Sequence, residues 1–168
     1  MKKTMLTLSL LLTVSAGALA QTAAAAPQPP ARGPSLELAA EAARAAIDSC
    51  TAREQKVAVS VIDSAGVLKA LLAADGASAR GVQSSTNKAG TALAFKAATS
   101  QLGETAKTDK ELAEKIAANP AYNSRAGGVL IRVNNEVIGA IGVGGARGSE
   151  NDEACAVAGL QKVQDRLR

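Results

Sequence analysis

The stretch VAVSVIDSAGVLKALLA, residues 57–73, has the pattern of two short strands joined by a tight turn. Residues 57–62 are mostly β-branched and few in number, which predicts a strand. Asp63 comes next, with a side chain that can bond to the backbone just ahead of it, and Gly66 tolerates positive φ. Residues 67–73 are again apolar, so the whole segment predicts a β-hairpin.

A second hairpin is predicted over residues 129–143, directly after the pair Gly127 and Gly128. Its two apolar runs are separated by Asn134 and Asn135, a pair that tolerates the left-handed backbone of a compact turn. Hairpins pair their strands antiparallel, and the helical segments are separate from them in the sequence. We therefore expect the α+β class rather than a doubly wound parallel sheet.

Apolar residues recur at helical spacing in the remaining segments. Four helices are predicted, at about residues 36–53, 80–97, 108–119 and from 149 towards the C-terminus. Their expected N-terminal caps are Ser35, the capping box of Thr108 with Glu111, and Ser149 with Asp152. The predicted order is α-β-β-α-α-β-β-α, with one antiparallel sheet from the two hairpins, flanked by helices.

The first twenty residues have the three parts of a secretory signal peptide. Lys2 and Lys3 form a positive start, Met5–Val14 is apolar, and Ala18–Ala20 offers small residues for cleavage. The apolar run is too short for an ordinary membrane span, and an uncleaved anchor is the alternative. We expect residues 1–20 to be removed and the protein to be periplasmic or secreted.

Residues 21–34 are rich in Ala and Pro and predict a disordered or extended lead-in, so the folded domain should comprise residues 35–168. An exported chain meets an oxidising compartment, where cysteines can form disulfides. Cys50 and Cys155 fall in the first and last predicted helices. A disulfide joins them if these helices pack side by side, and two buried, unlinked thiols are the alternative.

The sequence contains no histidine, and its only aromatic residues are Phe95 and Tyr122. Without histidine, Ser-His-Asp and Cys-His catalysis are excluded, and the usual zinc and haem ligand is missing. Loss of Lys2 and Lys3 with the leader lowers the net charge from +4 to +2, which argues against a nucleic-acid surface. An Ala-rich core buries little area per residue, so we expect a homo-oligomer.

Two groups of polar residues are candidates for a ligand site. Lys88 and Thr91 lie three apart on one predicted helix face, although a solvated lysine and a packed threonine would give the same pattern. Tyr122, Asn123 and Arg125 stand in a loop before the glycine pair, where a ring, an amide and a cation suit an acidic or planar ligand. A plain helix-to-strand connection is the alternative for this loop.

The glycine-rich run at residues 142–148 lies between a predicted strand and a predicted helix, a place where backbone amides can hold an anion. A tight turn without a ligand is favoured, because the spacing lacks the dinucleotide fingerprint and the phosphate loop. Asp152 and Glu153 follow in the first turn of the last helix. Acidic residues are common there for electrostatic reasons, and we interpret the pair in that way.

Four blocks in this order resemble the GlcG/HbpS-like, or haem-degrading-domain, family. The blocks are Val61–Gly66, Asp75–Ala77, Lys88–Ala92 with Phe95, Thr99 and Leu102, and Gly139–Gly145 followed by Asp152 and Glu153. The resemblance covers roughly residues 35–167. It implies a profilin-like antiparallel sheet flanked by helices, assembly into dimers or larger oligomers, and haem binding in some members.

The leading hypothesis is an exported protein that binds haem or another tetrapyrrole and has no strong catalytic group, so a binding module is favoured over an enzyme. The residues expected near the ligand are Asp63, Gly66, Lys88, Thr91, Tyr122, Asn123, Arg125, Gly127 and Gly128. Without histidine, Tyr122 is the candidate for the haem iron. The alternative is a binder of small carboxylates such as 2-hydroxy acids, paired with Arg125 or Arg147, or an enzyme that acts on them.

Overall fold

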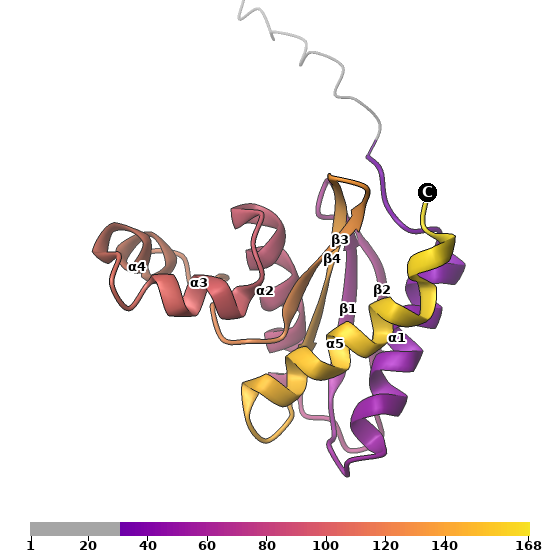
Figure 1. Cartoon of the computed structure of the whole chain (residues 1–168). Coiled ribbons are helices and arrows are strands. Elements are labelled where there is room, and N and C mark those ends of the chain that lie inside the picture. Colours follow the sequence, from indigo (N-terminus) through magenta and orange to yellow (C-terminus); the bar gives the residue numbers. More distant parts are fainter. Residues whose placement is uncertain (1–30) are drawn as a thin grey trace, which may run out of the picture.

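The structure is a computed structural model and describes residues 31–168 (Figure 1). Its elements in chain order are α1 (Leu36–Thr51), β1 (Ala58–Asp63), β2 (Leu68–Ala73), α2 (Ala79–Phe95), α3 (Thr99–Thr105), α4 (Lys110–Ala117), β3 (Gly128–Val133), β4 (Glu136–Gly144), α5 (Ser149–Val163) and the short 3₁₀ helix η1 (Gln164–Arg166). The predicted α+β class and order are confirmed. The structure adds α3, a seven-residue helix that follows α2.

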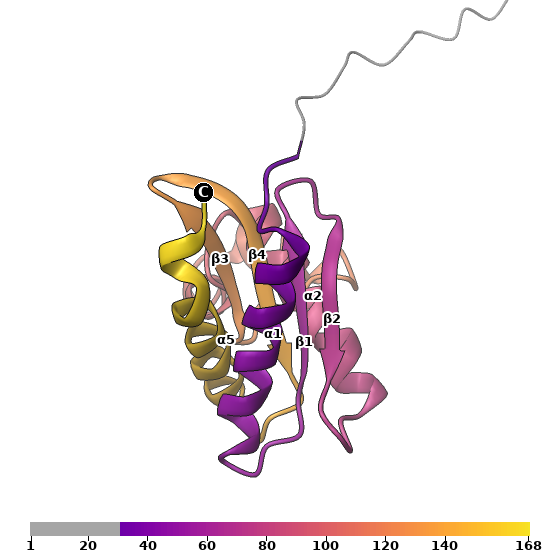
Figure 2. The ribbon, with the colours of Figure 1, turned by 90° about the vertical axis from the view of Figure 1, so that its right-hand side faces the viewer.

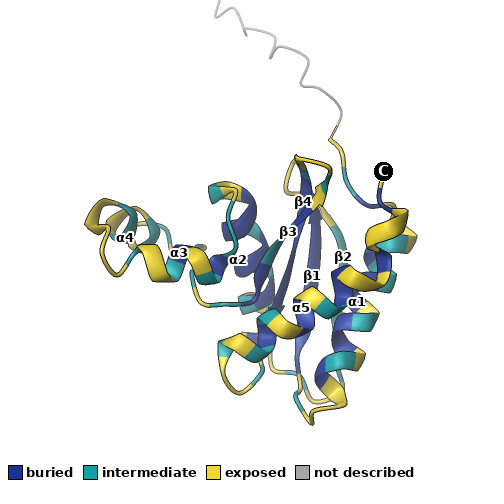
Figure 3. Cartoon of the chain, viewed as in Figure 1, coloured by how far each residue is buried: buried dark blue, intermediate teal, exposed yellow. Residues whose placement is uncertain are grey.

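The four strands form one sheet in the order β2-β1-β4-β3, and every neighbouring pair is antiparallel. Each predicted hairpin forms, and the two join through β1 and β4 in the centre. Helices α1 and α5 lie side by side on one face of the sheet, and α2 covers the other face (Figure 2). The central strands are buried and α4 is exposed (Figure 3).

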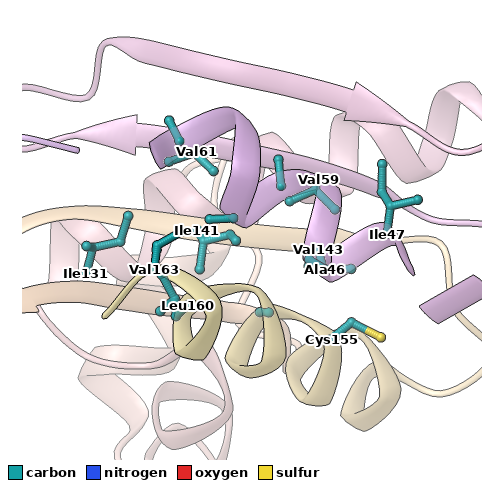
Figure 4. Close-up of a cluster of buried hydrophobic side chains, with 14 of the residues drawn as sticks. Ala46, Ile47, Val59, Val61, Ile131, Ile141, Val143, Cys155, Leu160 and Val163 are labelled. Carbon is teal, nitrogen blue, oxygen red and sulfur yellow. The ribbon is translucent and has the colours of Figure 1, made fainter. Parts of the chain in front are cut away.

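Small residues bring α1 and α5 close together. Ala39, Ala42, Ala43 and Ala46 are all buried on α1. A side chain at Gly159 of α5 would lie 2.5 Å from the Ala42 carbonyl oxygen, so the glycine permits this approach. Valine and isoleucine side chains from the sheet fill the space beneath the two helices (Figure 4).

The same helix pair carries a disulfide between Cys50 and Cys155, whose Cα atoms lie 5.6 Å apart. The sequence did not decide between a disulfide and two unlinked thiols. In the structure α1 packs against α5, and the two cysteines are linked. The bridge joins positions 105 residues apart. In the chain-entropy model, closing so long a loop contributes about 4–5 kcal/mol to stability.

The other face of the sheet approaches α2 closely because glycines face the helix. A Cβ at Gly142 would overlap the Ser85 carbonyl oxygen, and one at Gly144 would lie 2.6 Å from the Gly81 carbonyl oxygen. The buried hydroxyls of Ser60 and Ser85 bond to each other at 2.8 Å between these layers. The N-terminal half of α2 is therefore held firmly against the end of β4.

Two predicted helix caps are wrong in detail. Asp109 rather than Thr108 caps α4, because its carboxylate accepts the Leu112 amide at 3.0 Å. Helix α5 begins after Gly148, and within residues 31–168 no side-chain cap bonds to its N-terminus. Asp152 was expected to support this N-terminus, but its side chain turns to other partners described below.

The predicted signal peptide and residues 21–30 of the lead-in lie outside the described residues. Among the described residues, Arg32, which precedes Ser35, contacts the domain. Arg32 and Ser64 exchange hydrogen bonds, from the Arg32 amide to the Ser64 hydroxyl at 2.9 Å and from the Ser64 amide to the Arg32 carbonyl at 2.8 Å. Arg32 also pairs with Glu136. Within residues 31–168 no helix is both long and apolar enough to cross a membrane.

Candidate functional site

A buried ion pair joins α2 to α5. The Lys88 ammonium lies 2.6 Å from Asp152 Oδ2 and donates a second hydrogen bond to the Val143 carbonyl oxygen at 3.0 Å. Lys88 is 2% exposed and Asp152 3%. The other oxygen of Asp152, Oδ1, accepts the Ala146 amide at 2.9 Å. The pair therefore also fixes the turn between β4 and α5.

Burial disfavours the charged form of both side chains in this pair. It lowers the pKa of Lys88, and the hydrogen bond and charge of Asp152 oppose that shift. It likewise raises the pKa of Asp152, against the effect of Lys88. Each group supplies the other with a counter-charge and a hydrogen bond in place of those that burial has removed from water.

The glycine pair at residues 127 and 128 passes directly over this ion pair. A Cβ at Gly127 would lie 2.9 Å from Lys88 Nζ and 2.8 Å from Asp152 Cβ, and the φ of Gly127 is 124°. The Gly127 amide donates to Glu153 Oε2 at 3.3 Å, and the Gly128 amide donates to the Thr99 hydroxyl at 2.8 Å. Only glycine fits this backbone and this space.

The loop that carries Tyr122, Asn123 and Arg125 is attached to α2. The Thr91 hydroxyl donates to the Asn87 carbonyl at 2.7 Å and accepts the Asn123 amide at 2.8 Å. The Asn123 side chain donates to the Ser84 hydroxyl at 3.1 Å. These bonds hold the loop beside the buried lysine.

A cleft of about 660 Å³ lies between α2, this loop and the start of α5. It is lined by Ser78, Arg80, Gly81, Gln83, Ser84, Asn87, Lys88, Pro120, Tyr122, Asn123, Arg125, Gly145, Ala146, Ser149 and Asp152. The volume falls in the range of small-molecule and cofactor sites. Tyr122 is half-buried in the lining, with its ring edge-on to Phe95 at 5.1 Å between centroids.

Four of the nine predicted site residues line this cleft, and three others lie next to it. Lys88, Tyr122, Asn123 and Arg125 line it, and Thr91 anchors its loop from α2. The backbone of Gly127 and Gly128 runs behind Lys88.

Asp63 and Gly66 lie apart from this group. Asp63 pairs with Gly139, whereas Ala58, at the cleft end of β1, pairs with Gly144. Asp63 lies five residue steps along the strand from Ala58, or roughly 17 Å. The Asp63 carboxylate accepts the Ala65 and Val67 amides, each at 2.9 Å, so it builds its own turn.

Sequence reasoning missed Asp152 and Arg80. An acidic residue in the first turn of a helix is ordinary, so nothing local distinguishes Asp152 from a residue that serves the helix dipole. Its role depends on the packing of α5 near α2, across 64 positions of sequence. No sequence signal marks Arg80.

Metal ligands do not gather in the described part of the chain. Within residues 31–168, no three Cys, Asp or Glu side chains come together as a metal site. The cleft offers cations, amides, hydroxyls and one phenol instead. Such a set can hold an acidic ligand, and the phenol can coordinate iron that a ligand brings with it.

Comparison with known proteins gives a family match and several similar folds. The family model described as haem-degrading protein HbpS-like matches residues 35–161. No curated protein matches the chain in the sequence search. A double-mutant form of HbpS from Streptomyces reticuli is 30% identical, with a TM-score of 0.72, covering 88% of this chain and 97% of that one.

Two further solved structures share the fold at lower identity. A complex of PduOC with heme is 22% identical, with a TM-score of 0.70, covering 77% of this chain and 94% of that one. The Klebsiella pneumoniae protein ORFY is 24% identical, with a TM-score of 0.75, covering 84% of this chain and 98% of that one.

Proposed function

Because the chain belongs to the HbpS-like family of haem-degrading proteins, we propose that it is an exported protein that binds haem or a related tetrapyrrole. The family match over residues 35–161 carries the proposal. That match spans the whole cleft lining from Ser78 to Asp152. The heme complex of PduOC, a protein of the same fold, supports it further.

The residues of the cleft fit such a ligand. Its volume of about 660 Å³ accommodates a cofactor, with Tyr122 and Pro120 offering apolar surface at one side. Arg80 and Arg125 supply positive charge for propionate groups. Within residues 31–168 the Tyr122 hydroxyl forms no hydrogen bond, so it is free for the iron, and tyrosine is an established type of haem ligand.

Export is part of the proposal. The first twenty residues have the form of a signal peptide, and the disulfide between Cys50 and Cys155 suits an oxidising compartment. A periplasmic or secreted location follows. Mass spectrometry of the protein purified from its native compartment tests this, since the account expects an N-terminus at Gln21 and an intact disulfide.

Self-association is also proposed. Apolar side chains remain exposed along and beside the edge strand β2, namely those of Val67, Leu68 and Leu71. An edge strand with exposed apolar residues is a natural site for pairing with another chain. Sedimentation of the purified protein should give a mass above that of one chain, and a strictly monomeric protein would remove this part of the proposal.

A hemin titration of the purified protein, followed at the Soret band, tests haem binding. We expect a saturable spectral change. Tyr122→Phe should weaken binding and alter the Soret band, because it removes only the hydroxyl. Thr105→Val, which removes an exposed hydroxyl outside the cleft lining, should behave like the wild type. Absence of a saturable change would end the proposal, whereas a Tyr122→Phe protein identical to wild type would end only the role of Tyr122.

A further inference from the structure

The cleft carries an excess of positive charge. Its lining contains three cations, Arg80, Lys88 and Arg125, and one carboxylate, Asp152, which gives a net charge of +2. The structure has a second cleft, of about 580 Å³, beside α1 and β2. Its charged lining residues are Arg44, Asp48, Glu54, Lys56 and Asp75, with a net charge of −1. Of these two clefts, the first therefore carries the excess of positive charge.

Two of the three cations have no counter-charge. Arg80 and Arg125 are exposed, and within residues 31–168 neither forms an ion pair. Burial dominates the pKa shifts of Lys88 and Asp152, and Arg125 is close enough for its charge to add a smaller effect on both groups. An arginine beside a paired lysine, with no carboxylate of its own, suits a bound anion.

The third cation has a hydrogen-bond donor to spare. An ammonium group carries three hydrogens. Among residues 31–168, Lys88 Nζ bonds only to Asp152 Oδ2 and the Val143 carbonyl oxygen, and Lys88 belongs to the lining of the cleft. A buried donor with a free hydrogen favours a ligand oxygen, because leaving it unpaired costs free energy.

Two helix N-termini border the same space. Helix α2 is 17 residues long and contributes Arg80 and Gly81 to the lining, next to its N-cap residue Ser78, and α5 is 15 residues long and contributes Ser149. In the described part of the chain, no side chain caps the N-terminus of α5. Helix N-termini favour anions, so their field adds to that of the side chains.

We propose that this cleft is a binding site for a ligand with two carboxylates, held by Arg80, Arg125 and the free hydrogen of Lys88. Two sources share this chemistry, the paired propionates of a tetrapyrrole and a free small dicarboxylate. The first source rests on the proposed function, and the second does not. Two carboxylates match the net charge of +2, whereas a neutral ligand would leave both arginines uncompensated.

Calorimetric titration with succinate, and with its neutral analogue succinamide, tests the free dicarboxylate. Parallel titrations with hemin and with hemin dimethyl ester, in which both propionates are uncharged, test the tetrapyrrole. Each is repeated with Arg80→Gln and Arg125→Gln, and with Arg44→Gln as the control that removes a positive charge from the second cleft. All three arginines are exposed, so the variants should fold, and circular dichroism checks this.

We expect the charged form of at least one ligand to bind, its neutral form to bind much more weakly, and each cleft variant to lose about tenfold in affinity. Arg44→Gln should match the wild type. Succinate binding without hemin binding would support the dicarboxylate site and overturn the haem proposal. Equal binding of hemin and its ester, unaffected by the cleft variants and without succinate binding, would overturn this inference and leave the haem proposal standing.

Discussion

Lys88 on α2 and Asp152 on α5 approach to 2.6 Å although 64 residues separate them. The two helices cover opposite faces of the sheet, so the pair ties the layers together at the C-terminal end of β4, where Lys88 also bonds to the Val143 carbonyl. The same contact forms one wall of the cleft. The same buried interaction therefore contributes to both the fold and the site.

Breaking this pair on one side should be costly. Asp152→Asn leaves the Lys88 charge buried without a counter-charge, and we expect a loss of about 3–5 kcal/mol of unfolding free energy. The double variant Lys88→Met with Asp152→Leu removes both charges and should be less destabilised than the sum of its single variants. Urea unfolding of the wild type, the Lys88→Met and Asp152→Leu single variants and the double variant measures the difference. Strictly additive losses would show that the two side chains do not act as a pair.

The disulfide should contribute a large part of the stability. Replacing Cys50 and Cys155 by alanine should lower the unfolding free energy by about 2–5 kcal/mol, since the unfolded chain regains a loop of 105 residues. Wild-type protein unfolded with and without a reductant gives an independent measurement. Equal urea midpoints in the two conditions would mean that the bridge does not stabilise the fold.

Two glycine-to-alanine substitutions should have opposite signs. Gly142→Ala places a Cβ against the Ser85 carbonyl and 2.6 Å from the Ala89 amide nitrogen, and forcing α2 off the sheet should cost about 1–3 kcal/mol. Gly90→Ala, within the same helix α2, meets nothing within 4 Å among the described residues beyond its chain neighbours and the nearby backbone of its own helix, and should stabilise by about 0.5–1 kcal/mol. Thermal melting compares them. Destabilisation by both would contradict the packing described for α2.

The ion pair between Glu41 on α1 and Arg166 on η1 should make stability depend on pH. The hydrogen bond from Arg166, 2.6 Å long, lowers the pKa of Glu41 below 4.5. The folded state therefore holds this proton less tightly than the unfolded state, and the stabilisation is present above pH 4.5 and disappears as pH falls through the lowered value. Glu41→Gln should melt slightly below wild type at neutral pH and equally at about pH 2. In an Arg166→Gln background, which lacks the partner of Glu41, the same Glu41→Gln substitution should produce no such difference.

The hairpins were predictable because their signals are local. β-branched runs and the turn at Asp63 and Gly66 specify strand and reversal within a few residues. Helix α3 was not predicted, because its seven residues include Thr, Ser and Gly and depend on burial of Leu102 and Thr99. The disulfide needed a distance that only the packing of α1 against α5 supplies.

The candidate site was predictable in part. Lys88 and the loop of Tyr122 to Arg125 were expected to serve one ligand, and they line one cleft. The burial of Lys88 and its pairing with Asp152 could not be predicted, because a lysine on a helix is ordinarily solvated. The turn at Asp63 was expected near the ligand on the basis of its sequence motif alone. In the structure, strand β1 places this turn at the end of the sheet away from the cleft.

Paramagnetic broadening by the ferric iron of bound hemin, observed in the amide NMR spectrum, tests the central claim that the cleft beside Lys88 holds the tetrapyrrole. The account predicts that the amides of Asn123, Arg125 and Gly145 broaden first, while those of Asp48 and Asp75 at the second cleft stay sharp. Broadening confined to the second cleft, with the Asn123 and Gly145 signals unchanged at saturating hemin, would contradict it.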